Sequence, residues 1–314
     1  MSFDLIAAAP GSQLTWNIAN DVAQLFHYDF MRNAFIAGTI VSVVAGVVGY
    51  FVVLRSLAFA GHALAHIGFA GAAGGVVVAA AVGAAGGASL AVGSIVGLLV
   101  FTIGAGVVMG VLGNRIRGRD LVIGIVLAWM LGLGVLFLNL YNGYATEAYA
   151  ILFGEILGIS SVAVLVTLVA GLVTLAAVTV LYRPLLFASL DDEVAAARGV
   201  PVRALSVVFM VLLAVAVSEA VQVVGVLLIF ALLVTPPAIA ERLTVRPPAV
   251  IALSAALAVA FTWLGLAIAY YAPYPVSFFI TSIAFATYLG ARGVDAVRQR
   301  RVHVIGEGAS AEAA

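Results

Sequence analysis

Apolar residues fill the chain in stretches of about 20 residues, the length that a helix needs to cross the hydrocarbon core of a bilayer. The stretches are apolar on all sides and do not alternate with polar residues, so they predict transmembrane helices and not the strands of a barrel. Nine spans are expected, at Asn33–Leu54, Leu57–Val82, Leu90–Leu112, Leu121–Leu140, Val162–Leu181, Leu205–Ser218, Val223–Ile239, Ala249–Tyr271 and Val276–Leu289.

The arginines set a direction for these spans. With an outer N-terminus, only Arg32 of the 14 basic residues lies outside. Such an excess of inner positive charge predicts an outer N-terminus and an inner C-terminus. The expected inner residues are Arg55, Arg115, Arg117, Arg119, Arg183, Arg198, Arg203, Arg242, Arg246, Arg292, Arg298, Arg300 and Arg301.

The fold class that follows is all-α, a polytopic transmembrane helical bundle in three parts. Residues 1–29 lack the basic start and unbroken apolar core of a signal peptide. They are expected to form an extracytoplasmic or interfacial segment, either a short amphipathic helix or a loosely ordered tail. Residues 30–292 form the membrane domain, with a cytoplasmic loop at about 183–203, and residues 293–314 form a cytoplasmic tail.

Composition narrows the function classes. Hydrophobic residues make up 65% of the chain and charged residues 9%, whereas a soluble domain carries about 25% charged residues. The net charge is zero and cysteine is absent, which argues against a nucleic-acid partner and excludes disulfides and thiolate metal sites. The chain has no lysine, so it has no phosphate-binding loop of the GxxxxGK[ST] type. If ATP drives its activity, another polypeptide hydrolyses it.

Two of the four histidines, His62 and His66, lie in the apolar segment "LAFAGHALAHIGFAG". Residues four apart share one face of a helix, so both imidazoles are placed to bind one divalent metal ion. An ionisable group within a span is also a functional hypothesis by default. The alternative is that both rings are core histidines bonded to neighbouring helices.

Glu219 and Gln222 interrupt the apolar run between the sixth and seventh spans. The carboxylate is a candidate third metal ligand that completes the histidine site or attracts cations at the outer mouth. The competing interpretation is a solvated residue in an outer turn.

One inner loop, "ASLDDEVAAARGVPV", carries the signals of a capped helix of about ten residues. Ser189 is expected to cap it, Asp191, Asp192 and Glu193 occupy its first turn, and Arg198 lies in its last turn before Gly199. A capped cytoplasmic helix between two spans is a docking element for another protein, or else an ordinary solvated helix.

Several blocks of the chain resemble the integral-membrane permease of the metal-ion ATP-binding-cassette importers that take up zinc, manganese or iron. They are "FMRNAFIAGTIVSVVAGVVGYFVVLRSLAFAGHALAH", "DLVIGIVLAWMLGLGVLF", "AILFGEILGIS", "VVGVLLIFALLVTPPAIAERL" and the loop "LDDEVAAARGVPV". The resemblance covers about Phe30 to Arg292, nearly the whole membrane region.

The resemblance implies a permease dimer, most simply a homodimer, with one ATPase per permease subunit and an extracytoplasmic metal-binding protein. It also implies that His62 and His66 line the ion path, that the loop helix docks on the ATPase, and that the permease itself is not an enzyme and holds no permanent cofactor. The family commonly has aspartate where His62 stands. Exchanging a carboxylate for an imidazole favours zinc over manganese or iron as the transported metal, or else provides a gate that senses pH.

Two rival functions remain at this point. A membrane-bound protein that uses histidines for haem or proton chemistry is one, although two histidines on one helix face cannot ligate both sides of the same haem. A proton-coupled secondary metal carrier is the other.

Overall fold

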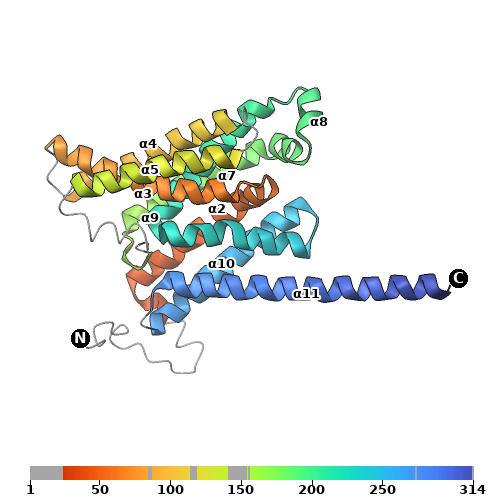
Figure 1. Ribbon diagram of the computed structural model, residues 1–314. Helices are drawn as coiled ribbons and strands as arrows, with labels where there is room; N and C mark the ends of the chain where they lie inside the picture. The colour runs from red at the N-terminus through yellow and green to blue at the C-terminus, as the bar shows by residue number, and fades with distance from the viewer. Residues whose placement is uncertain are drawn as a thin grey trace.

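The computed structural model describes residues 24–83, 87–113, 119–140, 154, 156–272 and 274–312, and over these residues it is helical with no strand. The long helices lie side by side in one bundle, and α11 extends beyond it on the side where α8 lies (Figure 1). The predicted segment 1–29 falls mostly outside the described residues. The elements are α2 Asp29–Leu54, α3 Ala58–Ala81, α4 Gly87–Gly113, α5 Arg119–Leu140, η1 Ile156–Gly158, α7 Ser161–Leu190, α8 Asp192–Ala197, α9 Val202–Leu243, α10 Pro247–Tyr271 and α11 Val276–Glu312.

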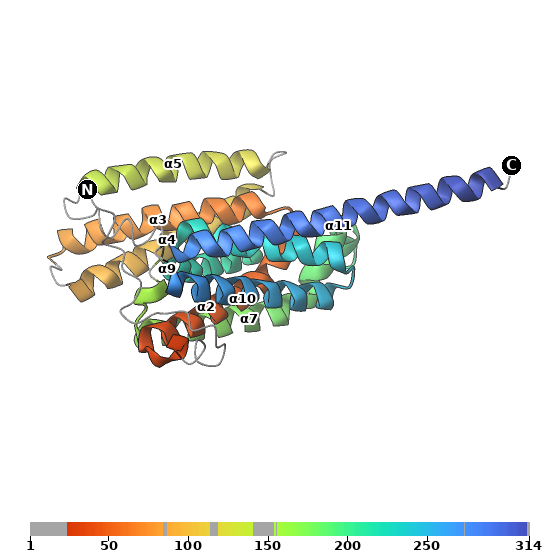
Figure 2. The same cartoon turned by 90° about the horizontal axis from the view of Figure 1, so that it is seen from below.

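Three helices form the centre of the bundle. In the most apolar 18-residue windows of α2, α3 and α9, 67%, 72% and 67% of residues are buried. The same measure is 17% for α5 and 22% for α7, and α5 lies at one edge of the bundle beside α3 (Figure 2). The peripheral helices are as apolar as the central ones, as expected where lipid replaces water around them.

Seven of the described helices are long and apolar enough to cross a membrane. This count takes α9 once and leaves out α11, whose first part is the predicted span Val276–Leu289. Each of the nine predicted spans therefore has a helical counterpart, because α9 contains both Leu205–Ser218 and Val223–Ile239.

Helix α9 folds back on itself. Near its start, Ser206 accepts a hydrogen bond from Arg55 at the end of α2 (2.8 Å). Further along, Glu219 reaches the middle of the bundle, where it borders Gly171 of α7 together with Ile40 of α2. Leu233 then returns to pack against Gly49, close to the end of α2 where α9 began. An unbroken helix would place Leu233 about 40 Å from Ser206, so the two arms of α9 run in opposite directions.

The reversal occurs at Gly225, whose φ of 82° and ψ of 166° are non-helical. This region of backbone conformation is essentially restricted to glycine. The polar interruption in the sequence predicts a break at Glu219–Gln222, between the sixth and seventh spans. The structure corrects this prediction, since the non-helical residue is Gly225 and Glu219 lies inside the first arm.

Helices α3 and α4 pack through glycines. A Cβ on Gly97 of α4 would lie 2.7 Å from the Cα of Gly75 in α3, a separation that real Cβ atoms essentially never show. The two backbones are therefore in direct contact, as expected for small residues at a membrane helix interface. This seam fixes α3, which carries His62 and His66, against the bundle.

Candidate metal centre

The two histidines lie together on α3. Their ring centroids are 4.6 Å apart with an interplanar angle of 76°, and the ring of His62 is also 5.2 Å from that of Phe230 in the second arm of α9. Both histidines are partly buried, whereas Ala63, Leu64 and Ala65 between them are fully buried. The helical spacing thus places both imidazoles on one side of α3, as the sequence predicts.

That side of α3 is only partly covered by the other described helices. Its partly or fully exposed positions recur at helical spacing and meet a similar row on α9, where Leu227 is 51% exposed and Phe230 37% exposed. We call this surface the open face; it consists of Phe59, His62, His66 and Phe69 on α3 with Leu227 and Phe230 on α9. The histidine pair is therefore partly exposed at the surface of the described bundle.

Glu219 lies elsewhere. It is 6% exposed and points toward α7, so it is a buried residue and not a solvated residue of an outer turn. Neither of its carboxylate oxygens has a hydrogen-bond partner among the described residues. Across the described residues, no three His, Cys, Asp or Glu side chains gather closely enough to hold a metal ion. The structure therefore does not bring Glu219 together with the histidine pair.

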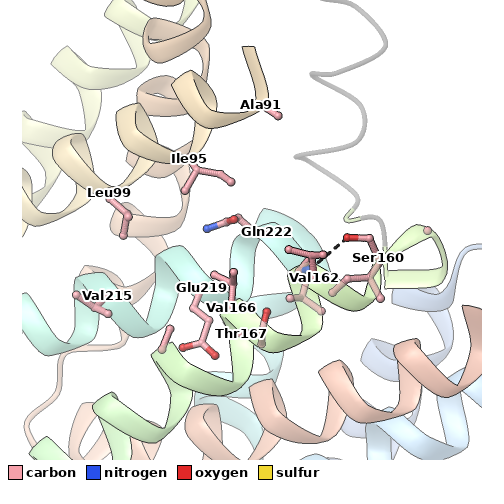
Figure 3. Close-up of a pocket in the computed structure, with 15 residues that line it drawn as sticks. Ala91, Ile95, Leu99, Ser160, Val162, Val166, Thr167, Val215, Glu219 and Gln222 are labelled. Carbon is pink, nitrogen blue, oxygen red and sulfur yellow. Dashed lines mark hydrogen bonds between the residues drawn. The ribbon is translucent and has the colours of Figure 1, made fainter. Parts of the chain in front are cut away.

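Glu219 lines a cavity of about 490 Å³ between α4, α7 and the first arm of α9 (Figure 3). The polar side chains of Thr167 and Gln222 line the same cavity, and Leu99 and Val215 are among its apolar neighbours. Thr167 was not a sequence candidate, since nothing in an apolar span marks which threonine will face a carboxylate from another helix.

The loop helix forms as α8, with different caps from those expected. Asp191 is the N-cap, and its Oδ1 accepts the N–H of Val194 (2.9 Å). Ser189 belongs to α7, where its hydroxyl donates to the carbonyl of Leu185. The helix is therefore six residues long and not about ten, because α7 continues through Pro184 to Leu190 and takes up Ser189, the expected cap, while Asp192 and Glu193 remain in the first turn of α8.

The C-terminal end of α8 agrees with the sequence prediction. Gly199 has a φ of 82°, its N–H bonds to the carbonyl of Ala196, and the N–H of Val200 bonds to that of Ala195 (both 3.0 Å). These two bonds form a Schellman motif. Asp192, Glu193 and Arg198 are exposed, while Ala195 is fully buried, so α8 presents a charged surface and is anchored by its alanine side.

A smaller polar cavity of about 270 Å³ separates α8 from the ends of α2, α7 and α9. Arg55 lies in it, bonded to Ser206 and with its guanidinium 5.5 Å from the ring centre of Phe209. Asp192 lines the same cavity. The loop helix is thus next to the residues that join α2 to α9.

Comparison of the sequence with known proteins identifies the family of the chain. Residues 27–294 match the family described as "ABC 3 transport family". The chain belongs to the ABC 3 transport family. Among curated relatives, the manganese transport system membrane protein MntC of Halalkalibacterium halodurans is 33% identical over 232 residues, covering 74% of this chain and 76% of that protein. The manganese import system permease protein ScaB of Streptococcus gordonii is 30% identical over 247 residues, covering 78% and 84%.

Solved structures agree with this membership of the ABC 3 transport family. The structure titled "PsaBC from Streptococcus pneumoniae in complex with Fab" matches with a TM-score of 0.74 and 30% identity, over 87% of this chain and 95% of that chain. An inward-facing conformation of a putative metal-chelate type ABC transporter shares the fold, with a TM-score of 0.64 and 17% identity over 92% and 91%.

Family membership settles the broad class. The chain is a multi-pass cell-membrane permease of a metal-ion ABC importer, and ATP hydrolysis belongs to a separate subunit. The haem-binding and secondary-carrier alternatives are not favoured. Glu147 and Glu155, which are further acidic residues of the expected outer loops, lie outside the described residues.

Proposed function

We propose that this permease carries a divalent transition-metal ion into the cell and that His62 and His66 form a transient binding station for it. The observation that carries this proposal is the pairing of the two imidazoles, 4.6 Å apart, on an open face of an ABC 3 family member. A transport site has to release its ion, so two protein ligands completed by water suit it better than a closed cage.

The open face supports a homodimer as the transporting unit. Facing lipid, two imidazoles would lie in hydrocarbon without hydrogen-bond partners, which is unfavourable. A second copy facing this surface would enclose the histidines in a path between the two protomers, with Phe230 beside His62 as a constriction. An extracytoplasmic metal-binding protein would deliver the ion at the end opposite α8, and the ATPase would dock at α8.

Two observations bear on which metal ion the permease transports. The relatives are named for manganese, whereas imidazole ligands raise the preference for zinc. We propose that His62, at a position where the family commonly has aspartate, shifts selectivity from manganese toward zinc. The substitution His62→Asp is then expected to raise the manganese-to-zinc uptake ratio of vesicles that hold the permease and its ATPase, measured with radioactive metal ions. An unchanged ratio would remove the zinc assignment.

The station itself is tested by truncation. His62→Ala and His66→Ala are each expected to lower metal uptake strongly, and the double variant to add little, because both side chains serve one ion. Since small residues surround the pair, assembly with the ATPase should persist. His27→Ala, a histidine at the start of the described chain, is the matched control and should transport normally. Normal uptake in both single variants would make the pair structural.

A further inference from the structure

The cavity between α4, α7 and the first arm of α9 lies apart from the histidine pair. Its lining in the described chain includes a single ionisable side chain, that of Glu219. Glu219 lines the cavity, and its buried carboxylate lies against Gly171 of α7, a glycine that Ile40 and Val44 of α2 also border. No positive side chain from these four helices is among the residues that surround it.

An unpaired carboxylate in this position is costly. Glu219 is 6% exposed, and both Oε1 and Oε2 are buried without a hydrogen-bond donor. Charges within a membrane bundle pair with an opposite charge or line an ion pathway. Because no arginine or histidine is among the described residues that line the cavity, either a proton or a bound cation has to supply the compensating charge, and the oxygens nearby favour a cation.

The neutral groups around Glu219 are oxygen donors. Thr167 lies four residues before Gly171 on the buried side of α7, and Thr174 lies three residues after it. The hydroxyl of Thr174 is buried without a partner. Gln222 donates through Nε2 to the carbonyl of Ser218 (3.3 Å), which leaves its amide oxygen as an acceptor. Carboxylate, hydroxyl, amide and water oxygens are the ligands that hard divalent cations prefer.

We propose that this cavity is a second cation station within each protomer, where Glu219 and the oxygens of Thr167 and Gln222 hold a partly hydrated hard divalent cation such as Mn²⁺. The proposal rests on the proposed function in one respect, the divalent charge of the cargo. A volume of about 490 Å³ leaves room for an ion with several of its waters. The carboxylate reaches the ion by rotation of its side chain, while the α9 backbone stays in place.

This station differs chemically from the histidine pair. One site offers imidazole nitrogen and the other offers only oxygen, so the two sites would favour different metals from the same mixture. The oxygen site favours manganese over zinc more than the histidine site does. A transporter with both stations can accept manganese although His62 softens the other site.

The test is Mn²⁺ binding to the purified permease–ATPase complex in lipid nanodiscs, followed by electron paramagnetic resonance and by nitrogen couplings in electron–nuclear double resonance. The wild type is expected to show a bound Mn²⁺ population without nitrogen couplings. Glu219→Gln removes the charge at nearly constant shape and should abolish that population. Thr167→Val should weaken it by roughly 10-fold.

Glu241→Gln is the matched control, because it makes the same change in the second arm of α9, away from the cavity, and should leave the oxygen-only population intact. The double variant His62→Ala with His66→Ala should also keep it while losing any nitrogen-coupled Mn²⁺. If Glu219→Gln binds oxygen-coordinated Mn²⁺ as the wild type does, or if the wild type shows none, the cavity is not a metal station. Loss of the oxygen-only signal in Glu219→Gln, together with a nitrogen-coupled Mn²⁺ signal that persists in the double histidine variant, would instead overturn the histidine assignment alone.

Discussion

Gly199 shows how much of the loop helix depends on one backbone conformation. Its φ of 82° closes the Schellman motif at the end of α8 and turns the chain toward Pro201 and α9. A β-branched residue in this conformation is strained by about 1–2 kcal/mol. A cap of this quality on a six-residue helix indicates that the orientation of α8 is specified and not left to the loop.

Gly199→Val is therefore expected to lower metal-stimulated ATP hydrolysis and co-purification of the ATPase, because α8 would no longer present Asp192 and Glu193 in a fixed direction. Co-purification after affinity capture of the permease measures docking, and phosphate release measures coupling. Gly199→Asn is the control, since asparagine tolerates the left-handed region and should retain most of both. Wild-type coupling in the valine variant would make α8 an ordinary solvated helix.

At the same scale, the sequence identified Glu219 as unusual but not its surroundings. Its neighbours come from α2 and α7, about 175 and 50 residues earlier in the chain, and spans that are apolar on all sides give no periodicity from which facing residues can be read. The histidine pair was predictable because its spacing is local to one helix. Ser189 and Asp191 are equally good cap residues by type, and only the extension of α7 past Pro184 to Leu190 leaves Asp191 as the cap of α8.

At the scale of the helices, packing depends on how closely two backbones approach each other. Gly97 of α4 lies against Gly75 of α3, whereas Gly104, two turns further along α4, has open space at the position of a Cβ. The two glycines lie in the same helix, so the same substitution changes helix propensity equally at both. Any difference between the two variants then reports packing.

Gly97→Val is expected to force α3 and α4 apart and to destabilise the protein by about 1–3 kcal/mol, as overpacking does in a close-packed interior. Thermal unfolding of the purified permease in detergent, followed by size-exclusion chromatography, measures the change. Gly104→Val carries the same propensity change without the clash and should unfold near the wild-type temperature. Equal unfolding temperatures for the two variants would show that the seam contributes no packing energy.

The spans themselves were predictable because length and apolarity alone define them. The break in α9 was not, since the chain holds 33 glycines and nothing local marks Gly225 as the one with non-helical angles. The polar residues predict the break at Glu219–Gln222 instead, but Glu219 lies inside the first arm, beside a cavity that Thr167 and Gln222 also line.

At the scale of the whole molecule, arginines gather at one end of the bundle. Arg55, Arg198 and Arg203 lie at or next to the end of the bundle that carries α8, and α11 leaves the bundle on the same side (Figure 1). Arginine in membrane proteins is concentrated on the cytoplasmic side. The α8 end is therefore proposed to face the cytoplasm, with residues 293–314 as a cytoplasmic tail and residues 1–29 outside.

This orientation can be measured directly because the chain has no cysteine of its own. Single cysteines at Ser12 and at Ser310 are expected to differ in intact cells, with position 12 labelled by a membrane-impermeant thiol reagent and position 310 labelled only after lysis. The opposite pattern would invert the bundle and move the α8 docking surface away from any cytoplasmic ATPase.

The reversal of α9 at a single glycine also constrains what can change in this chain over evolution. Most connections between helices absorb an inserted or deleted residue in a surface loop. Here both arms are helical up to the turn, so one residue added to the second arm before Phe230 would rotate everything after it by about 100°. Phe230 would turn away from His62, and Leu233 away from Gly49. The number of residues between Gly225 and Phe230 is therefore constrained by the helical repeat. We expect natural relatives to have no insertion or deletion between these two positions.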